Sequence, residues 1–176
     1  MELRDRRTGH GVTLALRQYQ YPGATDDLDA NWLIVHGKLT VPGESWSFTD
    51  PCLMVGEAAW LGNWLERLAN RESRTDARDD DFPAVSFTEP NIGFSCVAID
   101  DAGATLRLFL DYESGPPSRR EADDDRALQL DVVISDADLR VAADAWKRDL
   151  ARFPLRGLGA GAPTKPRGLR RLFPRR

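Results

Sequence analysis

The sequence predicts an α+β protein with one largely antiparallel sheet of about six or seven strands and two amphipathic helices. Two segments repeat apolar residues at steps of three and four positions, which is the spacing of a helix face. The other apolar segments are short. In some of them apolar and polar residues alternate, and others are rich in strand-forming residues. Short links with Gly, Pro or Asp separate most of them, which favours hairpin pairing. The expected order is three strands, a helix, four strands and a second helix.

The first half of the chain is expected to form a strand, a hairpin and a helix. The first strand is expected over 12–21, where the alternation ends at a Pro-Gly pair. A second Pro-Gly pair separates two runs of strand-forming residues, 32–41 and 45–49, and predicts the hairpin. The helix is expected over 55–70, because two tryptophans and three leucines share one face there.

The second half is expected to add four strands and a closing helix. A charged stretch with no apolar stripe, 71–81, is expected to be a loop. The strands are expected at 85–88, 93–99, 105–113 and 128–134. Ser135 and Asp138 have the spacing of a helix N-cap, and an apolar stripe follows them as far as Phe153.

The few cysteines and histidines restrict the chemistry that the chain can perform. Cys52, Cys96, His10 and His36 are the only residues of these two types, which excludes a disulfide scaffold. None of them stand at the close spacing of a zinc site, so we expect no metal and no cofactor. No apolar run is long enough to cross a bilayer, and the charged first residues do not resemble a secretory signal. We therefore expect a cytoplasmic protein that does not bind membranes.

The net charge of −4 is divided unevenly along the chain. Seven basic and no acidic residues lie from Arg156 onward, which leaves 17 basic against 28 acidic residues in 1–155. We expect 1–155 to form the folded domain and 156–176 to be a basic tail with Gly and Pro, outside that domain. The acidic body disfavours nucleic acid as a partner and favours a basic macromolecule.

Carboxylates are the main candidates for catalysis in this composition. Glu89 and Glu113 each lie at the end of an expected strand, as the acid and base of a glycoside hydrolase do. Pairs of this kind are common in a chain with 28 acidic residues, so solvated strand ends are the simpler interpretation. Cys96 shares a strand face with Phe94, which favours a buried apolar role over that of a nucleophile.

Five tryptophans offer either core packing or a contact surface. Trp60, Trp64 and Trp146 lie on the apolar stripes of the expected helices and are expected in the core. Trp32 and Trp46 lie on the two arms of the expected hairpin. They could form a cross-strand pair or a surface for a partner, and the sequence leaves both possibilities open.

Several short motifs follow one another along the chain. They are DANWL (29–33), GESWSFTDPCL (43–53), FTEPNIGF (87–94) and YESGPP (112–117), with a closing helix that stops at FPLR (153–156). In this order they resemble the WapI-type immunity proteins of bacterial polymorphic toxin systems. The resemblance extends over residues 12–156 and leaves the basic tail outside.

The resemblance implies a small bacterial cytosolic protein that protects its producer. Such proteins bind the toxic C-terminal domain of a WapA- or Rhs-like polymorphic toxin, which is often a nuclease. The family brings no catalytic residues and no cofactor to this chain, so the resemblance implies a protein that is not an enzyme.

An acidic body suits such a partner, because nucleases carry positive charge to hold phosphates. We therefore expect a carboxylate-rich face to cover the toxin's active site. The candidate toxin-binding residues are Asp26, Asp27, Asp29, Trp32, Trp46, Asp79, Asp80 and Asp81. Two alternatives stay open, a small hydrolase that uses Glu89 and Glu113, and a scaffold domain localised by its basic tail.

Overall fold

The computed structural model describes residues 1–72, 75, 84–121 and 127–157, which form an α+β fold. Eight strands in these residues make two antiparallel four-stranded sheets, ordered β1-β2-β3-β4 and β5-β6-β7-β8. The strands are β1 (Glu2–Arg4), β2 (Gly11–Tyr19), β3 (Trp32–Val41), β4 (Glu44–Met54), β5 (Val85–Ser86), β6 (Ile92–Asp100), β7 (Gly103–Leu110) and β8 (Leu128–Ile134). The helices are α1 (Val55–Ala69), α2 (Pro117–Glu121) and α3 (Asp136–Leu150), with 3-10 turns at Asp29–Asn31 and Tyr112–Ser114.

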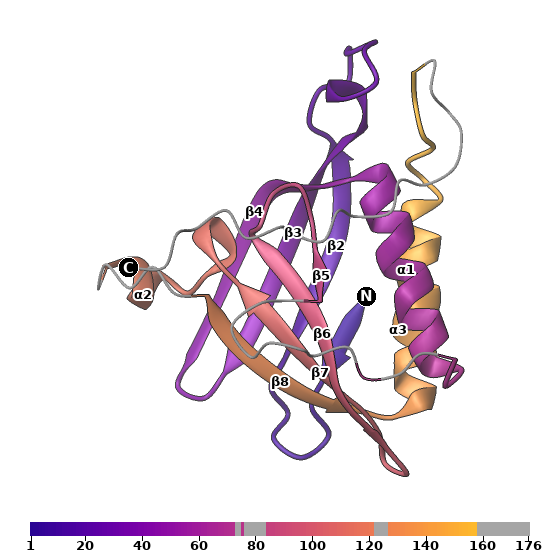
Figure 1. Cartoon of the computed structure of the whole chain (residues 1–176). Helices are drawn as coiled ribbons and strands as arrows, with labels where there is room; N and C mark the ends of the chain where they lie inside the picture. The colour runs from indigo at the N-terminus through magenta and orange to yellow at the C-terminus, as the bar shows by residue number, and fades with distance from the viewer. Residues whose placement is uncertain (73–74, 76–83, 122–126, 158–176) are drawn as a thin grey trace, which may run out of the picture.

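The two sheets cross each other, and α1 and α3 lie side by side along one flank (Figure 1). One contiguous apolar core takes side chains from both sheets and from both long helices. In the first sheet the alternation of the sequence becomes an alternation of burial, with Val12, Leu14 and Leu16 pointing inward. In the second sheet β6 and β7 are buried on both faces over much of their length.

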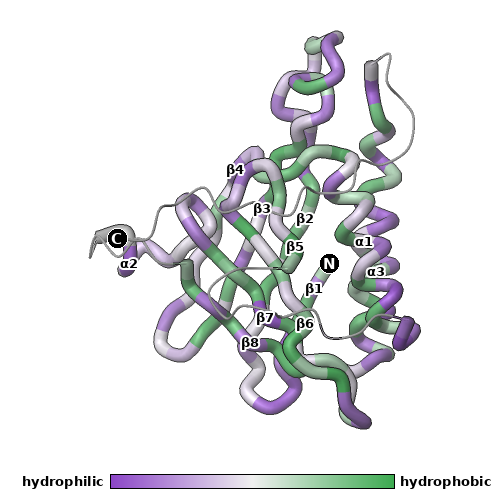
Figure 2. The backbone as a smooth tube through the Cα atoms, viewed as in Figure 1, coloured by the Kyte–Doolittle hydropathy of each residue, from purple (hydrophilic) through white to green (hydrophobic). Residues whose placement is uncertain are grey.

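The helix pair is fixed by an indole that crosses between the two helices. Trp146 of α3 is fully buried, and its Nε1 donates a hydrogen bond to the Ala58 carbonyl of α1 at 2.7 Å. Gly62 lets the helices approach closely, because a Cβ there would lie 3.1 Å from the Trp146 ring. Both helices are amphipathic, with hydrophobic and hydrophilic residues in alternating patches along the backbone (Figure 2).

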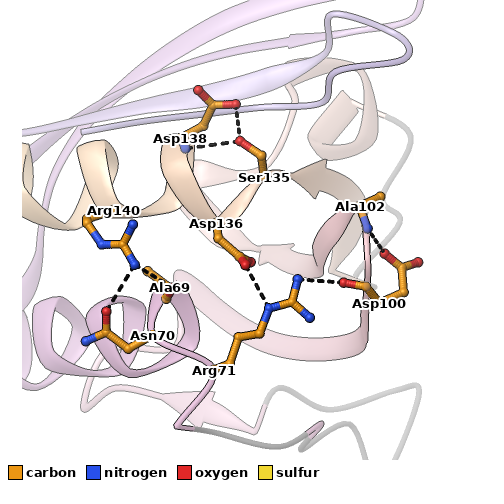
Figure 3. A network of polar contacts seen from close by, with 9 residues as sticks. All are labelled: Ala69, Asn70, Arg71, Asp100, Ala102, Ser135, Asp136, Asp138 and Arg140. Carbon is orange, nitrogen blue, oxygen red and sulfur yellow. Dashed lines mark hydrogen bonds and ion pairs between the residues drawn. The ribbon is translucent and has the colours of Figure 1, made fainter.

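A polar network joins the end of α1 to the start of α3 (Figure 3). Arg71 donates from Nε to Asp136 at 2.7 Å and from Nη2 to the Asp100 carbonyl at 2.8 Å. Arg140 reaches back to the Ala69 carbonyl at 3.0 Å. The Ser135 hydroxyl accepts the N–H of Asp138 at 3.1 Å, which confirms the predicted N-cap of the second helix.

The two sheets meet at one edge, where the segment after β1 lies beside β8. The N–H of Arg6 donates to the Val133 carbonyl at 3.1 Å, and the N–H of Val133 donates to the Asp5 carboxylate at 2.8 Å. At the opposite edge of the first sheet, the Trp46 indole donates to the Ser114 carbonyl after β7 at 2.9 Å. The sheets are therefore linked on both sides.

The α+β class, the antiparallel pairing and the two long helices are confirmed, but the expected single sheet is wrong. The strands divide into two sheets, because β4 pairs with no described strand other than β3 and the chain then passes into α1. Strand β1 precedes the expected first strand, and the sequence does not reveal it because only Leu3 of its three residues is apolar.

Two further elements differ in extent from the prediction. The second arm of the hairpin continues to Met54, past Pro51, which an edge strand tolerates because its outward N–H groups need no partner strand. The connection between β7 and β8, where the sequence predicts no helix, contains the short helix α2, which starts at Pro117, the residue favoured in a first helical turn. No helix in the described parts of the chain is both long and apolar enough to span a membrane.

Candidate functional site

A polar hollow with a volume of about 370 Å³ is lined mainly by acidic and amide side chains. We call it the acidic hollow. Its lining residues are Gln20, Tyr21, Asp29, Trp32, Asp50, Pro51, Glu89, Asn91 and Glu113.

Four segments that are far apart in the sequence build the acidic hollow. The loop between β2 and β3 supplies Asp29, and the adjoining first residue of β3 is Trp32. The edge strand β4 supplies Asp50. The segment before β6 supplies Glu89, and the 3-10 turn after β7 supplies Glu113. The hollow therefore depends on the docking of the two sheets against each other.

A buried amide organises two of the four carboxylates. Asn91 is 4% exposed, and its Nδ2 donates to Asp50 at 2.6 Å and to Glu113 at 3.4 Å. Burial raises the pKa of Asp50, and the neighbouring carboxylates of Glu113 and Glu89 raise it further, against the effect of the Asn91 hydrogen bond. The hollow thus holds negative charges that repel one another.

The segment that carries Glu89 is anchored to the start of α1. Glu57 is 6% exposed, and its Oε1 accepts the N–H of Thr88 at 2.7 Å and the hydroxyl of Thr88 at 2.8 Å. Its Oε2 accepts the N–H of Met54 at 2.9 Å, where the helix begins. One buried carboxylate therefore fixes both the helix start and the residue before Glu89.

Among the described residues, no cation neutralises the negative charge of the acidic hollow. No Lys, Arg or His side chain of the described residues forms an ion pair with any of its four carboxylates. The described residues also contain no group of three or more His, Cys, Asp or Glu suited to a metal ion. Tyr21 and Trp32 add partly exposed aromatic surface to the lining. Carboxylates beside aromatic rings suit the side chain of an arginine or lysine.

The three predicted aspartates of the loop between β2 and β3 have different positions. Asp29 lines the acidic hollow. Asp26 is engaged within the loop, where its Oδ1 accepts the N–H of Leu28 at 3.1 Å and of Asp29 at 2.8 Å. Asp27 is exposed and lies against Gly157. Asp79, Asp80 and Asp81 lie outside the described residues.

The two hairpin tryptophans do not form a cross-strand pair. Trp32 pairs with Met54 and Trp46 pairs with Leu39 in the register of β3 and β4. Trp32 is half-buried and lines the acidic hollow, whereas Trp46 is 8% exposed and belongs to the core. The side chain of Trp46 is therefore directed to the Ser114 carbonyl and away from the surface.

Sequence reasoning considered Glu89 and Glu113 only as a hydrolase pair, and it missed Asp50 and Asn91. All four residues lie inside the motifs that carry the family resemblance, GESWSFTDPCL, FTEPNIGF and YESGPP. A search of those motifs for charged residues directly before a proline could have found Asp50 and Glu89, but not Asn91 or Glu113. Both cysteines are buried, and burial raises the pKa of the Cys52 thiol, so it is not a thiolate at neutral pH.

Comparison with known families gives one match over most of the chain. The model of the immunity protein WapI-like family matches residues 3–154 of the 176. This range contains every residue that lines the acidic hollow. No curated protein and no solved structure matches the chain.

Proposed function

The chain belongs to the WapI-like immunity protein family, and from this premise we propose that it neutralises the C-terminal domain of a WapA- or Rhs-like polymorphic toxin. The proposed action is stoichiometric: the protein binds the toxin domain in the cytoplasm of the producing cell and covers its working surface. A nuclease domain is the favoured partner, because its phosphate-binding surface is basic.

The observation that carries this proposal is the acidic hollow. Its four carboxylates come from separate segments and have no ion-pair partner among the described residues. Glu89 and Glu113 repel the charge of Asp50, and a cation from outside the chain relieves this repulsion. A basic side chain of the toxin that enters the hollow can no longer bind the toxin's own substrate. The excess of acidic residues in the body also accelerates the encounter with a basic domain.

Amide substitutions in the acidic hollow test the proposal directly. The triple variant Asp29→Asn, Glu89→Gln and Glu113→Gln removes three charges while keeping side-chain size. We expect its Kd for the toxin domain to rise at least about tenfold at low salt, with a weaker dependence on ionic strength. Titration calorimetry at two salt concentrations measures both effects, and co-expression with the toxin measures the loss of protection.

A matched control removes the same number of charges elsewhere. Glu72, Asp101 and Asp144 are exposed and lie away from the acidic hollow, so Glu72→Gln, Asp101→Asn and Asp144→Asn should leave the Kd within about twofold. Equal weakening by both triple variants would show that only the net charge matters, and would reject the acidic hollow as the contact site. A wild-type protein that fails to bind or protect would reject the immunity function itself.

The hydrolase alternative keeps one observation in its favour, since Glu89 and Glu113 line the same hollow beside Asp50. A general acid and a carboxylate partner can act together only when they share such a site. Incubation of the purified protein with a panel of glycosides decides the matter. Turnover that is lost in Glu89→Gln or Glu113→Gln would favour the enzyme and contradict action by occlusion.

A further inference from the structure

The loop between β2 and β3, residues 20–31, projects beyond the body of the molecule (Figure 1). We call it the projecting loop. It is mostly hydrophilic, with hydrophobic residues between the polar ones (Figure 2). Leu28 is 67% exposed and Tyr21 is 45% exposed, which makes them two of the few large apolar side chains on the described surface. Tyr21 and Asp29 also line the acidic hollow, so the loop forms one of its walls.

Despite its projection, the projecting loop is internally hydrogen-bonded. The Asp26 carboxylate accepts two backbone N–H groups, as described above. The backbone carbonyl of Asp26 accepts the N–H of Ala30 at 3.1 Å. The N–H of Asn31 donates to the Leu28 carbonyl at 3.1 Å. Leu28 therefore sits on a short, closed turn of backbone.

Arg156 holds this turn from outside. Its guanidinium donates to the carbonyls of Pro22 at 2.8 Å, Tyr21 at 3.1 Å and Ala30 at 2.8 Å, so it joins the two ends of the loop. The same group stacks over the ring of Tyr19, with 3.6 Å between Cζ and the ring centroid.

The backbone of Arg156 is fixed as well as its side chain. Asn31 is 3% exposed, and its amide accepts the N–H of Arg156 at 2.9 Å and donates to the carbonyl of Arg156 at 2.8 Å. Lysine cannot replace this arrangement, because an ammonium group lacks the planar fork that serves several carbonyls and stacks on a ring. Arg156 also lies beyond the matched range of the family, which ends at residue 154.

We propose that the projecting loop is a preformed docking element for the toxin domain, with Leu28 and Tyr21 as apolar anchors and Arg156 as the positioning residue. This inference rests on the proposed function. The partner is a basic protein surface, because the anchors are surrounded by Asp26, Asp27 and Asp29 and adjoin the acidic hollow. Apolar anchors within a charged rim are the usual arrangement of strong contact residues, and a loop ordered before binding loses less entropy on association.

The first experiment tests the positioning role of Arg156. In Arg156→Lys and Arg156→Gln, hydrogen exchange of the Ala30 and Asn31 amides in the free protein should become at least about tenfold faster. Affinity for the toxin domain should fall about tenfold in both variants. An effect of charge alone would raise the affinity of Arg156→Gln for the toxin domain, because the loss of a positive group from an acidic surface strengthens its attraction to a basic partner.

Arg71→Lys is the matched control, since Arg71 also bridges distant segments with a guanidinium but lies at the junction of α1 and α3 (Figure 3). It should change neither the exchange of the loop amides nor the affinity. Unchanged loop exchange in the Arg156 variants would overturn the positioning role. So would faster exchange without any loss of affinity.

A second experiment tests the apolar anchor. Leu28→Ala should lower the affinity for the toxin domain about tenfold, whereas Val141→Ala, which truncates a 65% exposed side chain on α3, should have no effect. Equal affinity of Leu28→Ala and the wild type would overturn the assignment. So would a wild-type homodimer in light scattering that Leu28→Ala dissociates, because the loop would then serve a second copy. Failure of the wild type to bind the toxin would instead reject the proposed function.

Discussion

At the scale of single residues, the Asp5 carboxylate joins the two sheets. It is 2% exposed, and it accepts the N–H groups of Arg7, Thr8 and Val133, each at 2.8 Å. Burial alone would raise its pKa, but these backbone hydrogen bonds outweigh that effect and lower the pKa to about 2 from an ordinary 3.8. The ionised form is therefore the one that the fold stabilises.

The sign of this pKa change predicts how stability depends on pH. Because the folded-state pKa is lowered, the contribution of Asp5 is present above pH 3.8 and is lost as the pH falls toward 2. Its size is about 2 kcal/mol of unfolding free energy. We expect Asp5→Asn to lose about this much at pH 7 in urea unfolding, and the difference from the wild type to shrink between pH 4 and pH 2.

A control for this prediction is Asp101→Asn in the exposed turn between β6 and β7. It should change the unfolding free energy by less than about 0.5 kcal/mol. If the difference between Asp5→Asn and the wild type stayed constant down to pH 2, ionisation of Asp5 would not be its source.

At the scale of elements, the hairpin of β3 and β4 shows how local pattern and packing combine. Its turn lies at Pro42 and Gly43, and Gly43 has the positive φ of 77° that glycine adopts without strain. Inside the hairpin, Gly37 faces Phe48 across the strands, and the Phe48 ring occupies the space that a side chain at 37 would need. The ring of Phe48 is itself buried, so it has little room to move.

This packing predicts a strong effect of the smallest substitution. Gly37→Ala should destabilise the protein by about 1 to 3 kcal/mol, because the added methyl overlaps the Phe48 ring. Gly23→Ala is the control, since no atom lies within 4 Å of its added methyl. Differential scanning calorimetry of the two variants checks the expectation, and a Tm for Gly37→Ala equal to that of the wild type would contradict it.

Elements with a strong local pattern are those that the sequence predicts. The sequence predicts the bounds of strands β3 and β8 and the N-cap at Ser135. It does so because periodicity and capping are properties of neighbouring residues. The division into two sheets and the docking of one on the other depend on pairings and contacts between distant residues, such as that of Asp5 with Val133, which are separated by 128 residues. No local pattern encodes such a contact, and the sequence therefore predicted one sheet.

At the scale of the whole molecule, the same distinction separates predictable from unpredictable parts of the site. The sequence indicated an acidic body and identified Asp29 and Trp32 as contact candidates, and both line the acidic hollow. It could not place Asp50 and Glu113 beside them, because β4 and the turn after β7 meet only when both sheets are assembled. Composition thus indicates the sign of the surface charge, whereas assembly decides where the charges gather.

A pair of truncations tests where the functional unit ends. Removing 158–176 takes away six basic residues, so the net charge falls from −4 to −10. We expect a Tm within about 2 °C of the wild type, and faster association with a basic toxin domain in stopped-flow measurements.

Removing 156–176 also deletes Arg156, and this chain should bind the toxin about tenfold more weakly than the one ending at 157. Equal affinity of the two truncated chains would contradict a role for Arg156. Slower association after removal of 158–176 would instead show that the basic segment itself contacts the toxin.

Arg156, which holds the projecting loop, is synthesised long after the loop itself. Asn31 leaves the ribosome's catalytic centre 125 residues before its partner Arg156 is added, which corresponds to roughly 6 to 25 s of translation. Throughout that interval a nascent chain contains the projecting loop but not the guanidinium group that holds it. Under the proposed function, a producer cell that makes toxin and antidote together would be protected only by finished copies, and premature termination shortly before residue 156 would yield a folded protein that gives poor protection.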